Sequence, residues 1–302
     1  MSEVRNSGQP VILFAEECVC GALCEDNQCS VLHAGIPLGD LLIVASSIGA
    51  NSEGAAAAQG VVEQFHAHLA GLPSDFPAEQ AIREASAQAN ERLLRTSESS
   101  TAAGAPMCST VVLALLQRDD GGIRAWIGHI GHSRAYLVRA NRLHQLTDDH
   151  SAVRALLNQG ILSMEEAPGH PDALVATRCL GRFPKTEIEI DHLPLASDDT
   201  LLLCSEGLWA SVPEQKIQGA IASAGVTLEA IAHHLLGLAL AMGSPTSIGI
   251  EMARLIPPPE SAPSRNEPGR SIPRWILAVF LLAFVGLGML AGVLAYLALW
   301  RN

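Results

Sequence analysis

Cysteine thiols are concentrated near the start of the sequence, where four of the seven cysteines lie between positions 18 and 29. Cys18, Cys20 and Cys24 recur at even intervals, which predicts that their side chains share one face of a β-strand. Clustered thiols could hold zinc or a metal cluster, but the spacing lacks the Cys-x-x-Cys pairs that are typical of such sites. We therefore expect reduced, buried thiols that pack as small hydrophobic side chains.

Histidines are further possible metal ligands, and two of them lie on a predicted amphipathic helix. Residues 54–72 carry apolar side chains at helical spacing, and His66 and His68 belong to this segment. His233 and His234 are adjacent on a later predicted helix, so their side chains face different sides. Neither pair is expected to bind a metal.

The stretch around residue 132 organises the predicted architecture. β-prone runs bounded by Gly and Asn predict consecutive antiparallel strands at residues 125–130, 135–138 and 143–146. Asn141 tolerates the left-handed conformation and predicts a hairpin turn, and Ser151 is a cap candidate for a helix beginning near Ala152. Further strands are expected at residues 11–15, 18–24, 40–45, 111–116, 200–205 and 248–252, and further helices after Ser74 and at residues 213–224 and 227–242.

Two motifs in this stretch resemble those of a known family. Residues 130–137 are Ile-Gly-His-Ser-Arg-Ala-Tyr-Leu, and residues 145–151 are Gln-Leu-Thr-Asp-Asp-His-Ser. They resemble Val-Gly-Asp-Ser-Arg-Ala-Tyr-Leu and Gln-Leu-Thr-x-Asp-His-Ser of the metal-dependent protein phosphatases of the type 2C serine/threonine class. The resemblance extends over about residues 9 to 255. It implies an α+β fold, a four-layer α/β/β/α sandwich of two antiparallel sheets flanked by helices.

The resemblance also implies where the site residues lie, and most of them are altered in this chain. The family's phosphate-binding arginine, the Glu-Asp pair near the metals, the bridging aspartate and the final Asp-Asn pair are all replaced. An aspartate associated with a third metal is a histidine here, and only one position keeps a carboxylate. In that order, the corresponding residues are Cys24, Gln28 with Cys29, Ser46 followed by Ser47, Ser244 with Pro245, His132, and Glu206.

The altered positions decide the functional expectation. Mg²⁺ and Mn²⁺ need oxygen ligands, mostly carboxylates, and Glu206 alone cannot compensate for two adjacent dications. We therefore expect no catalytic residues and no metal cofactor, and predict a catalytically inactive pseudophosphatase that acts as a signalling or binding module for a phosphoprotein or protein kinase. The alternative is an active metal-dependent serine/threonine protein phosphatase with a rebuilt site. It would use Mn²⁺ or Mg²⁺, or Zn²⁺ held by Cys29, His132 and Glu206. A purely structural membrane scaffold is a third hypothesis.

Composition narrows the class of protein further. The chain has 302 residues and a net charge of −12, which argues against nucleic acid as a partner because phosphate backbones need a basic surface. The apolar run at residues 11–15 is too short for a signal peptide, which favours reduced thiols. Alanine richness and the preference for arginine over lysine suggest a bacterial source.

The C-terminal part of the sequence predicts a membrane anchor. Residues 1–255 form the phosphatase-like domain, and residues 256–274 are a proline-rich linker. Residues 275–300 carry no charge and are long enough to cross a bilayer as a helix. Arg265, Arg270 and Arg274 precede this segment and only Arg301 follows it, which predicts a single-pass C-terminal anchor with the domain in the cytoplasm. Gly288 and Gly292 could support a homodimer.

Overall fold

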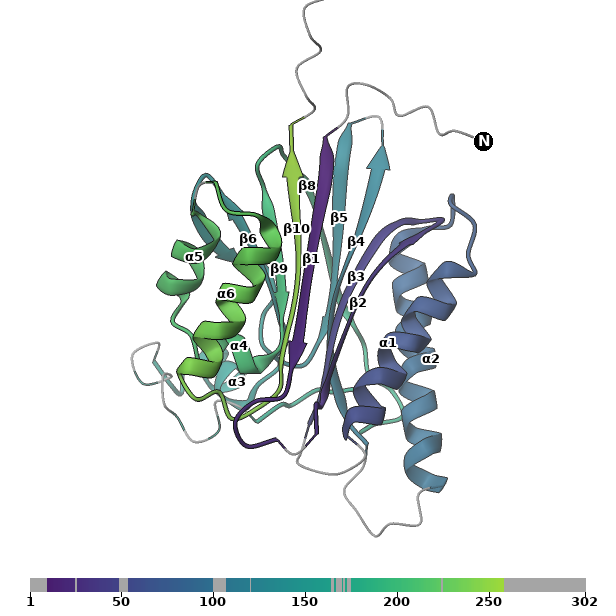
Figure 1. The fold of residues 1–302 in the computed structure, drawn as a ribbon. Helices are drawn as coiled ribbons and strands as arrows, with labels where there is room; N and C mark the ends of the chain where they lie inside the picture. The colour runs from purple at the N-terminus through teal and green to yellow at the C-terminus, as the bar shows by residue number, and fades with distance from the viewer. Residues whose placement is uncertain are drawn as a thin grey trace, which may run out of the picture. The chain divides into compact units, whose positions relative to one another are not determined.

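The computed structural model describes residues 10–24, 26–48, 54–99, 107–119, 121–163, 166, 170, 172, 175–223 and 225–257. The chain divides into two compact units, Met1–Pro258 and Pro259–Asn302, and the described residues all belong to the first. Two five-stranded sheets pack face to face in this unit, with helices on the outer face of each (Figure 1). The predicted α+β sandwich of two antiparallel sheets with flanking helices is confirmed.

Strand order shows how distant segments meet. The first sheet has the order β1-β10-β9-β6-β7 and the second β2-β3-β4-β5-β8, and all pairings are antiparallel. The first sheet consists of β1 (Val11–Val19), β10 (Ile248–Ile256), β9 (Thr200–Cys204), β6 (Arg134–Arg139) and β7 (Arg142–Gln145). The second consists of β2 (Cys29–Ile36), β3 (Gly39–Ser47), β4 (Ser109–Asp119), β5 (Gly122–Ile130) and β8 (Glu189–Leu195).

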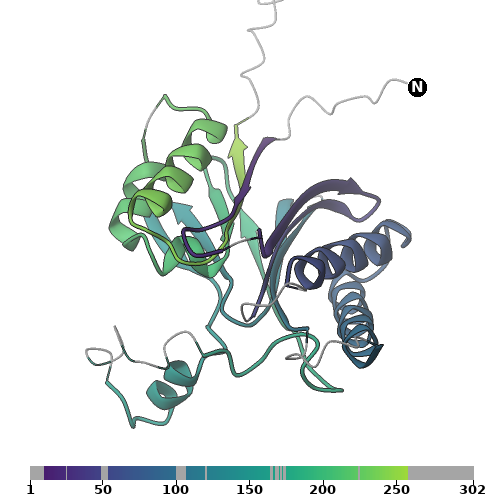
Figure 2. The same cartoon turned by 60° about the horizontal axis from the view of Figure 1, so that its bottom comes forward.

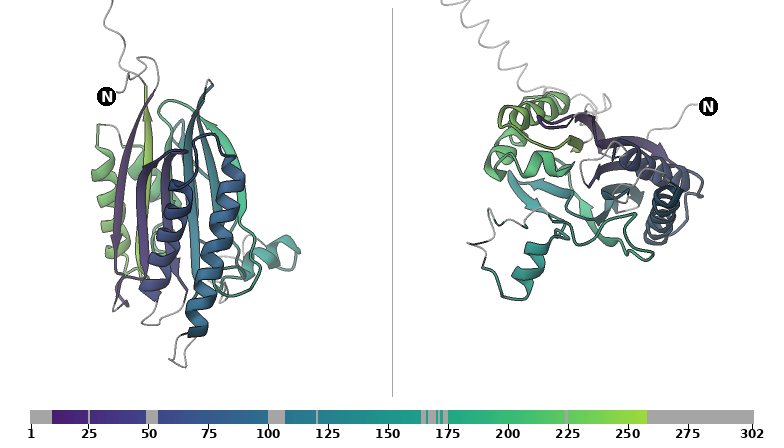
Figure 3. Two further views of the ribbon diagram at one scale, coloured as in Figure 1. Left: turned by 90° about the vertical axis from the view of Figure 1, so that its right-hand side faces the viewer. Right: turned by 90° about the horizontal axis from the view of Figure 1, so that it is seen from below.

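Helices cover the two outer faces of the sandwich. The second sheet packs against α1 (Gly54–Ala70) and α2 (Ala78–Ser99), which run side by side along it in Figure 3. The first sheet packs against α4 (Glu206–Trp209), α5 (Glu214–Ile221) and α6 (Leu228–Ala241). A further helix, α3 (Ala152–Asn158), lies apart from these layers in Figure 2.

Alternating side chains separate the core into layers. Leu42 and Val44 of β3 point between the sheets toward Leu201 and Leu203 of β9, whereas the intervening residues of each strand face the helices. Burying both faces explains why β3, β4 and β9 are nearly continuous apolar runs rather than alternating ones.

Several local predictions are confirmed. The predicted helices correspond to α1, α2, α3, α5 and α6 within a few residues at each end. Ala140 and Asn141 turn the β6–β7 hairpin with φ values of 49° and 59°, the left-handed conformation that a two-residue turn of this kind needs. Ser151 caps α3, because its side chain accepts a hydrogen bond from the Arg154 N–H at 3.2 Å.

The predicted strand at residues 18–24 is wrong. Only Cys18 and Val19 belong to β1, and the chain then turns so that Ala22 N–H donates to the Ser244 carbonyl at 2.8 Å. A side chain at Gly21 would lie 2.1 Å from the Thr246 oxygen, so close contact with the β10 approach replaces strand pairing here. Sequence patterns also did not predict β2, β8 or α4, since none of the three has a clear periodicity.

The predicted meander is wrong in one connection. β5 and β6 are consecutive in the chain but belong to different sheets, and residues 131–133 carry the chain from one sheet to the other. Gly131 adopts φ of +99°, where a Cβ would lie 2.4 Å from the Thr110 methyl group. This crossover, rather than a hairpin, positions His132 at the end of the sandwich.

Among the residues that the structure describes, no helix has the length and apolar character needed to cross a bilayer. The predicted transmembrane segment at residues 275–300, the linker at residues 256–274 beyond Pro257, and Gly288 and Gly292 lie outside the described residues.

Close packing around Gly249 gives a testable stability effect. A Cβ at this position would lie 2.2 Å from the Cys29 Sγ, between the two sheets. We expect Gly249→Ala to lower the free energy of unfolding by about 2 kcal/mol through overpacking, as measured by urea denaturation. Because Cys29→Ala removes the sulfur, the double variant should recover much of this loss; strictly additive effects of the two substitutions would contradict the contact.

Candidate functional site

A histidine and a carboxylate meet at one end of the sandwich. His132 lies in the crossover between β5 and β6, and Glu206 is the first residue of α4, directly after β9. The His132 Nε2 and Glu206 Oε2 atoms are 3.4 Å apart, and their side chains are only 6% and 15% exposed. The end of one sheet crossover and the start of a helix therefore place two groups capable of acid–base chemistry together.

Burial tunes both members of the His132–Glu206 pair toward neutral forms. It raises the pKa of the Glu206 carboxyl to about 7 and lowers the pKa of the His132 imidazole. His132 Nδ1 is buried and has no hydrogen-bond partner among the described residues, while the His132 carbonyl accepts a bond of 2.9 Å from Trp209 Nε1. A carboxyl group with a pKa near 7 can both accept and donate a proton at neutral pH.

Arg134 contacts Trp209, which holds the His132 backbone. Arg134 donates two hydrogen bonds to the Asp149 carboxylate, at 2.9 and 2.7 Å, and its guanidinium lies 3.6 Å from the centre of the Trp209 ring. Trp209 in turn holds the His132 backbone, so the charge pair fixes the position of His132 through the indole ring.

The other predicted site positions gather at the same end. Ser47 Oγ donates to Gln28 Oε1 at 3.1 Å, and Cys29 lies opposite Ser46 in the β2–β3 pairing. Ser244 Oγ donates to the Gly207 carbonyl at 2.8 Å, next to Glu206 in the chain. Cys24 Sγ lies 3.4 Å from the Pro245 carbonyl. The structure thus brings these segments together as the resemblance implied.

These residues do not fit two adjacent divalent cations. Glu206 supplies the one carboxylate among them, and the neutral Gln28, Ser46, Ser47 and Ser244 side chains cannot offset the charge of two dications. Cys29 is also not part of a group with His132 and Glu206, because its sulfur packs over Gly249 between the sheets. The predicted zinc set of Cys29, His132 and Glu206 is therefore not assembled in the described part of the chain.

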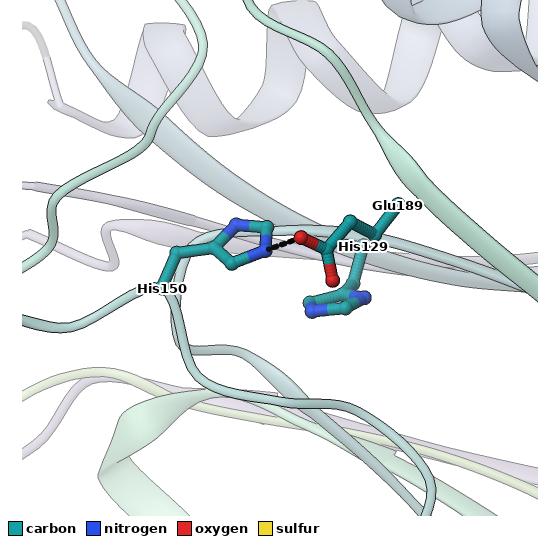
Figure 4. A group of neighbouring side chains, drawn as sticks. All are labelled: His129, His150 and Glu189. Atoms are coloured by element: carbon teal, nitrogen blue, oxygen red, sulfur yellow. Dashed lines mark ion pairs between the residues drawn. The ribbon is translucent and has the colours of Figure 1, made fainter. Parts of the chain in front are cut away.

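A second group of potential metal ligands lies close to Gly131 and does not include His132 or Glu206. Figure 4 shows His129, His150 and Glu189 converging from β5, from the loop before α3 and from the start of β8. Their donor atoms all lie within 4.8 Å of one another, and within the described ranges they form the only such group of three. Register explains part of this, since His129 and Glu189 are direct neighbours in the β5–β8 pairing.

Hydrogen bonds determine which atoms of this group are available. His129 Nε2 donates to the Asp148 carbonyl at 2.8 Å, which leaves a lone pair on its Nδ1 atom. The Gly131 N–H donates to His150 Nδ1 at 3.1 Å, so the His150 proton is on Nε2, 3.0 Å from Glu189 Oε1. A metal can bind Nε2 only when this proton moves to Nδ1, which breaks the hydrogen bond from Gly131.

The surroundings of His129, His150 and Glu189 are polar. Burial, followed by the neighbouring His129, lowers the pKa of His150 to about 4, so its ring is neutral. A groove of about 600 Å³ opens beside the group, and its charged lining consists of Arg83, Asp148, Arg178, Glu187, Glu189 and Asp191. Arg178 donates to Glu189 at 2.7 Å. Imidazole and carboxylate donors together suit a metal of intermediate softness such as Zn²⁺.

This second group was missed in the sequence because its members are far apart. His129 and His150 both lie in the motif-bearing stretch, but Glu189 is contributed by a strand that no periodicity predicted. The alternation of residues 125–130 predicts that His129 points to one face of a strand, yet the sequence does not reveal which strand lies beside it.

Comparison with known proteins places the chain in a family. The profile of the protein phosphatase 2C family matches residues 18–230. Since this match covers most of the chain, the chain belongs to the protein phosphatase 2C family. The fold, the two sequence motifs and the position of the His132–Glu206 pair agree with this assignment.

Individual relatives carry phosphatase names. The serine/threonine phosphatase stp of Listeria welshimeri is 32% identical over 186 residues, which cover 61% of this chain and 72% of that protein. The serine/threonine protein phosphatase PstP of Mycobacterium tuberculosis is 30% identical over 252 residues, which cover 82% of this chain and 45% of that protein. The solved catalytic domain of PstP in complex with 2 manganese ions has 26% identity and a TM-score of 0.70, over 82% of this chain and 100% of that chain.

These findings correct two expectations. The prediction of a catalytically inactive pseudophosphatase is contradicted by the relatives, which are named serine/threonine phosphatases. The expectation of no metal cofactor is also not supported, because the PstP domain holds manganese and because His129, His150 and Glu189 offer metal-ligand chemistry. The expectation counted carboxylates only at the positions of the family motifs. It did not consider metal ligands at other positions, such as His129 and Glu189, which pairing of β5 with β8 brings together.

Proposed function

We propose that this protein is a metal-dependent phosphatase that hydrolyses phosphoserine or phosphothreonine in proteins, with a rebuilt active site. The phosphatase relatives support the reaction class. One structural observation carries the proposal: the retained carboxylate, Glu206, has a pKa raised to about 7 and lies 3.4 Å from His132 at the end of the sandwich.

In this proposal Glu206 handles the protons of the hydrolysis. Its ionised form accepts a proton from the attacking water, and its protonated form returns a proton to the departing serine or threonine oxygen. His132 stays neutral because burial lowers its pKa, so it adds no positive charge that would depress the pKa of Glu206. The Trp209 bond to the His132 carbonyl holds the pair in place.

The metal is proposed to bind His129 Nδ1, His150 Nε2 and a Glu189 oxygen. When bound, a divalent ion would polarise a phosphoryl oxygen and lower the pKa of a water molecule. Arg83 and Arg178 line the adjacent groove and could neutralise the charge of a phosphate group. Gly131, whose N–H lies 3.1 Å from His150 Nδ1, directly precedes His132 in the chain.

Turnover of a phosphothreonine peptide by the full-length protein in detergent micelles tests the proposal, with Mn²⁺, Mg²⁺ and Zn²⁺ titrated separately. We expect metal-dependent turnover that rises as the pH passes through about 7, because Glu206 must be ionised to act as a base. Glu206→Gln should reduce turnover roughly 100-fold and remove the pH dependence. Glu189→Gln should instead raise the metal concentration required.

Matched variants keep this test specific. Glu229→Gln removes an exposed carboxylate on α6 and should leave turnover unchanged. The absence of metal-dependent turnover in a folded wild-type protein would overturn the proposed function. Turnover that survives Glu206→Gln but is lost in Glu189→Gln would show that Glu206 does not transfer the proton. The proton transfer would then be assigned to the group of His129, His150 and Glu189.

We further propose that residues 275–300 anchor the protein in a membrane as a single span, with the phosphatase domain in the cytoplasm. The uncharged segment, preceded by Arg265, Arg270 and Arg274, supports this arrangement. Phosphorylated proteins or a protein kinase at the membrane are the proposed partners, and Gly288 and Gly292 offer a packing face for a homodimer. Resistance of the protein to carbonate extraction from membranes, lost after deletion of residues 275–300, tests the anchor.

A further inference from the structure

We propose that Cys18 and Cys29 form a redox-active pair, at which a hydroperoxide converts two thiols into a disulfide that joins the two sheets. Cys18 lies on β1 of the first sheet and Cys29 on β2 of the second. This modification site is independent of the proposed phosphatase activity and is not part of the His132–Glu206 pair.

The two sulfur atoms lie beside the same glycine. Cys18 is the direct cross-strand partner of Gly249 in the β1–β10 pairing. The Cys29 Sγ lies over Gly249 from the opposite sheet, only 2.2 Å from the position that a Cβ there would occupy. Cys18 Sγ also lies 3.4 Å from the Cys29 carbonyl oxygen. Strand register and sheet packing therefore bring both thiols together between the sheets.

Asn27 holds the pair in this arrangement. Its Nδ2 group donates to Cys18 Sγ at 3.1 Å, and its Oδ1 atom accepts from the Cys29 N–H at 3.2 Å. One amide side chain thus contacts the sulfur of the first cysteine and the backbone of the second. A donor aimed at sulfur stabilises the thiolate form, which is the reactive form of cysteine.

The roles of the two thiols differ. The Cys29 thiol and the Asn27 amide lower the pKa of Cys18 to about 7, although burial and the neighbouring Glu16 oppose this change. The contact with the Cys18 thiol, followed by burial, raises the pKa of Cys29 well above its ordinary value. Cys18 is half-buried, whereas Cys29 is buried. Cys18 is therefore the thiol that meets the oxidant, and Cys29 the one that resolves the product.

The chemistry needs a single oxidant. The Cys18 thiolate attacks the terminal oxygen of hydrogen peroxide, the O–O bond breaks, and hydroxide leaves with its electron pair. The Cys29 sulfur then attacks the Cys18 sulfenic acid, releases water and loses its proton, which leaves the S–S bond. Two thiols and one peroxide thus give one disulfide and two water molecules.

Other cysteines provide internal comparisons. Cys108 and Cys179 lie next to the Ser109–Leu180 bridge and also form a thiol contact, but both are buried. Cys204 is fully buried on β9. An oxidant therefore reaches Cys18 more easily than the buried residues Cys108, Cys179 and Cys204.

Peptide mapping after oxidation tests the proposal. The full-length protein is treated with substoichiometric hydrogen peroxide, its remaining thiols are alkylated, and it is cut before aspartates. The cut before Asp26 separates residues 1–25 from residues 26–39. We expect a disulfide-linked peptide that joins these two segments, with fragment ions placing the bond at Cys18, and a melting temperature several degrees higher than that of the reduced protein.

Variants decide between the outcomes. Cys18→Ser should abolish the linked peptide, Cys29→Ser should leave a sulfenic acid on Cys18 that dimedone traps, and Cys204→Ser should change neither result. The proposal is overturned if the link between the two segments persists in Cys18→Ser. It is equally overturned if Cys108 and Cys179 oxidise while Cys18 remains open to alkylation.

Discussion

Replacing Glu251 with glutamine should raise the free energy of unfolding by about 3 kcal/mol at pH 7. Glu251 lies on β10 and is fully buried, and its cross-strand neighbour Glu16 is the side chain within hydrogen-bond reach of its carboxyl group. It faces the space between the sheets, on the same side of β10 as Ala253 and Leu255. Burial, and then the neighbouring Glu16, raise the pKa of this carboxyl to about 10.

The sign of this effect follows from proton binding. At neutral pH the folded protein keeps Glu251 protonated, whereas the unfolded chain, with a pKa near 4.5, releases the proton. Stability at Glu251 therefore falls by about 1.4 kcal/mol for each pH unit between about 4.5 and 10. Glutamine cannot ionise and removes this loss.

Denaturation by urea at pH 4.5 to 8 measures the effect. The difference between Glu251→Gln and wild type should be near zero at the acidic end and grow with pH. Glu229→Gln, an exposed change of the same chemistry, should show no such trend. A difference that stays constant over this range would mean that Glu251 is not held in its neutral form.

The second large effect concerns Arg134. We expect Arg134→Met to lower the free energy of unfolding by about 3 kcal/mol, because it leaves the Asp149 carboxylate nearly buried without its partner. The substitution also removes the cation from the Trp209 ring, which supports the His132 backbone. Thermal and urea unfolding measure the stability, and near-ultraviolet circular dichroism reports on Trp209.

An exposed pair provides the control. Arg124 and Asp119 are 3.6 Å apart, with side chains 41% and 45% exposed, so Arg124→Met should cost less than about 1 kcal/mol. Arg134→Lys keeps the charge but loses the two parallel hydrogen bonds, and an intermediate loss of stability is expected. Equal effects of Arg134→Met and Arg124→Met would show that burial does not strengthen the inner pair.

The family resemblance implied the sandwich, and sequence patterns predicted many of its individual helices and strands. The amphipathic helices were predicted from the helical spacing of their apolar residues. The strands β3, β4 and β9 were predicted from continuous apolar runs, because both faces of these strands are buried. β2 and β8 were missed, since β2 is only partly buried and β8 alternates irregularly along its length. The β5–β6 connection was misassigned because a glycine in a hairpin and a glycine in a crossover look alike in sequence.

The candidate site was predicted only where it follows a motif. His132 and Glu206 were named because they occupy family positions, and the structure places them together. Cys29 was wrongly grouped with them, since its alternation along β2 turns the sulfur toward Gly249. Glu189 joins the two histidines because β8 pairs with β5, where Glu189 lies opposite His129. These two residues are 60 positions apart in the sequence, and no local spacing predicts their contact.

The pairing of the first strand with the last has a consequence for how this domain forms. β1 has one neighbour in its sheet, and that neighbour is β10, where Val19 pairs with Ile248 and Val11 with Ile256. During synthesis from the N-terminus, β1 therefore cannot pair with β10 until nearly the whole domain has been synthesised. Such non-local pairing slows folding and exposes an unpaired apolar strand meanwhile. A nascent chain arrested before residue 248 should consequently depend on chaperones, whereas one extended well beyond residue 256 should not.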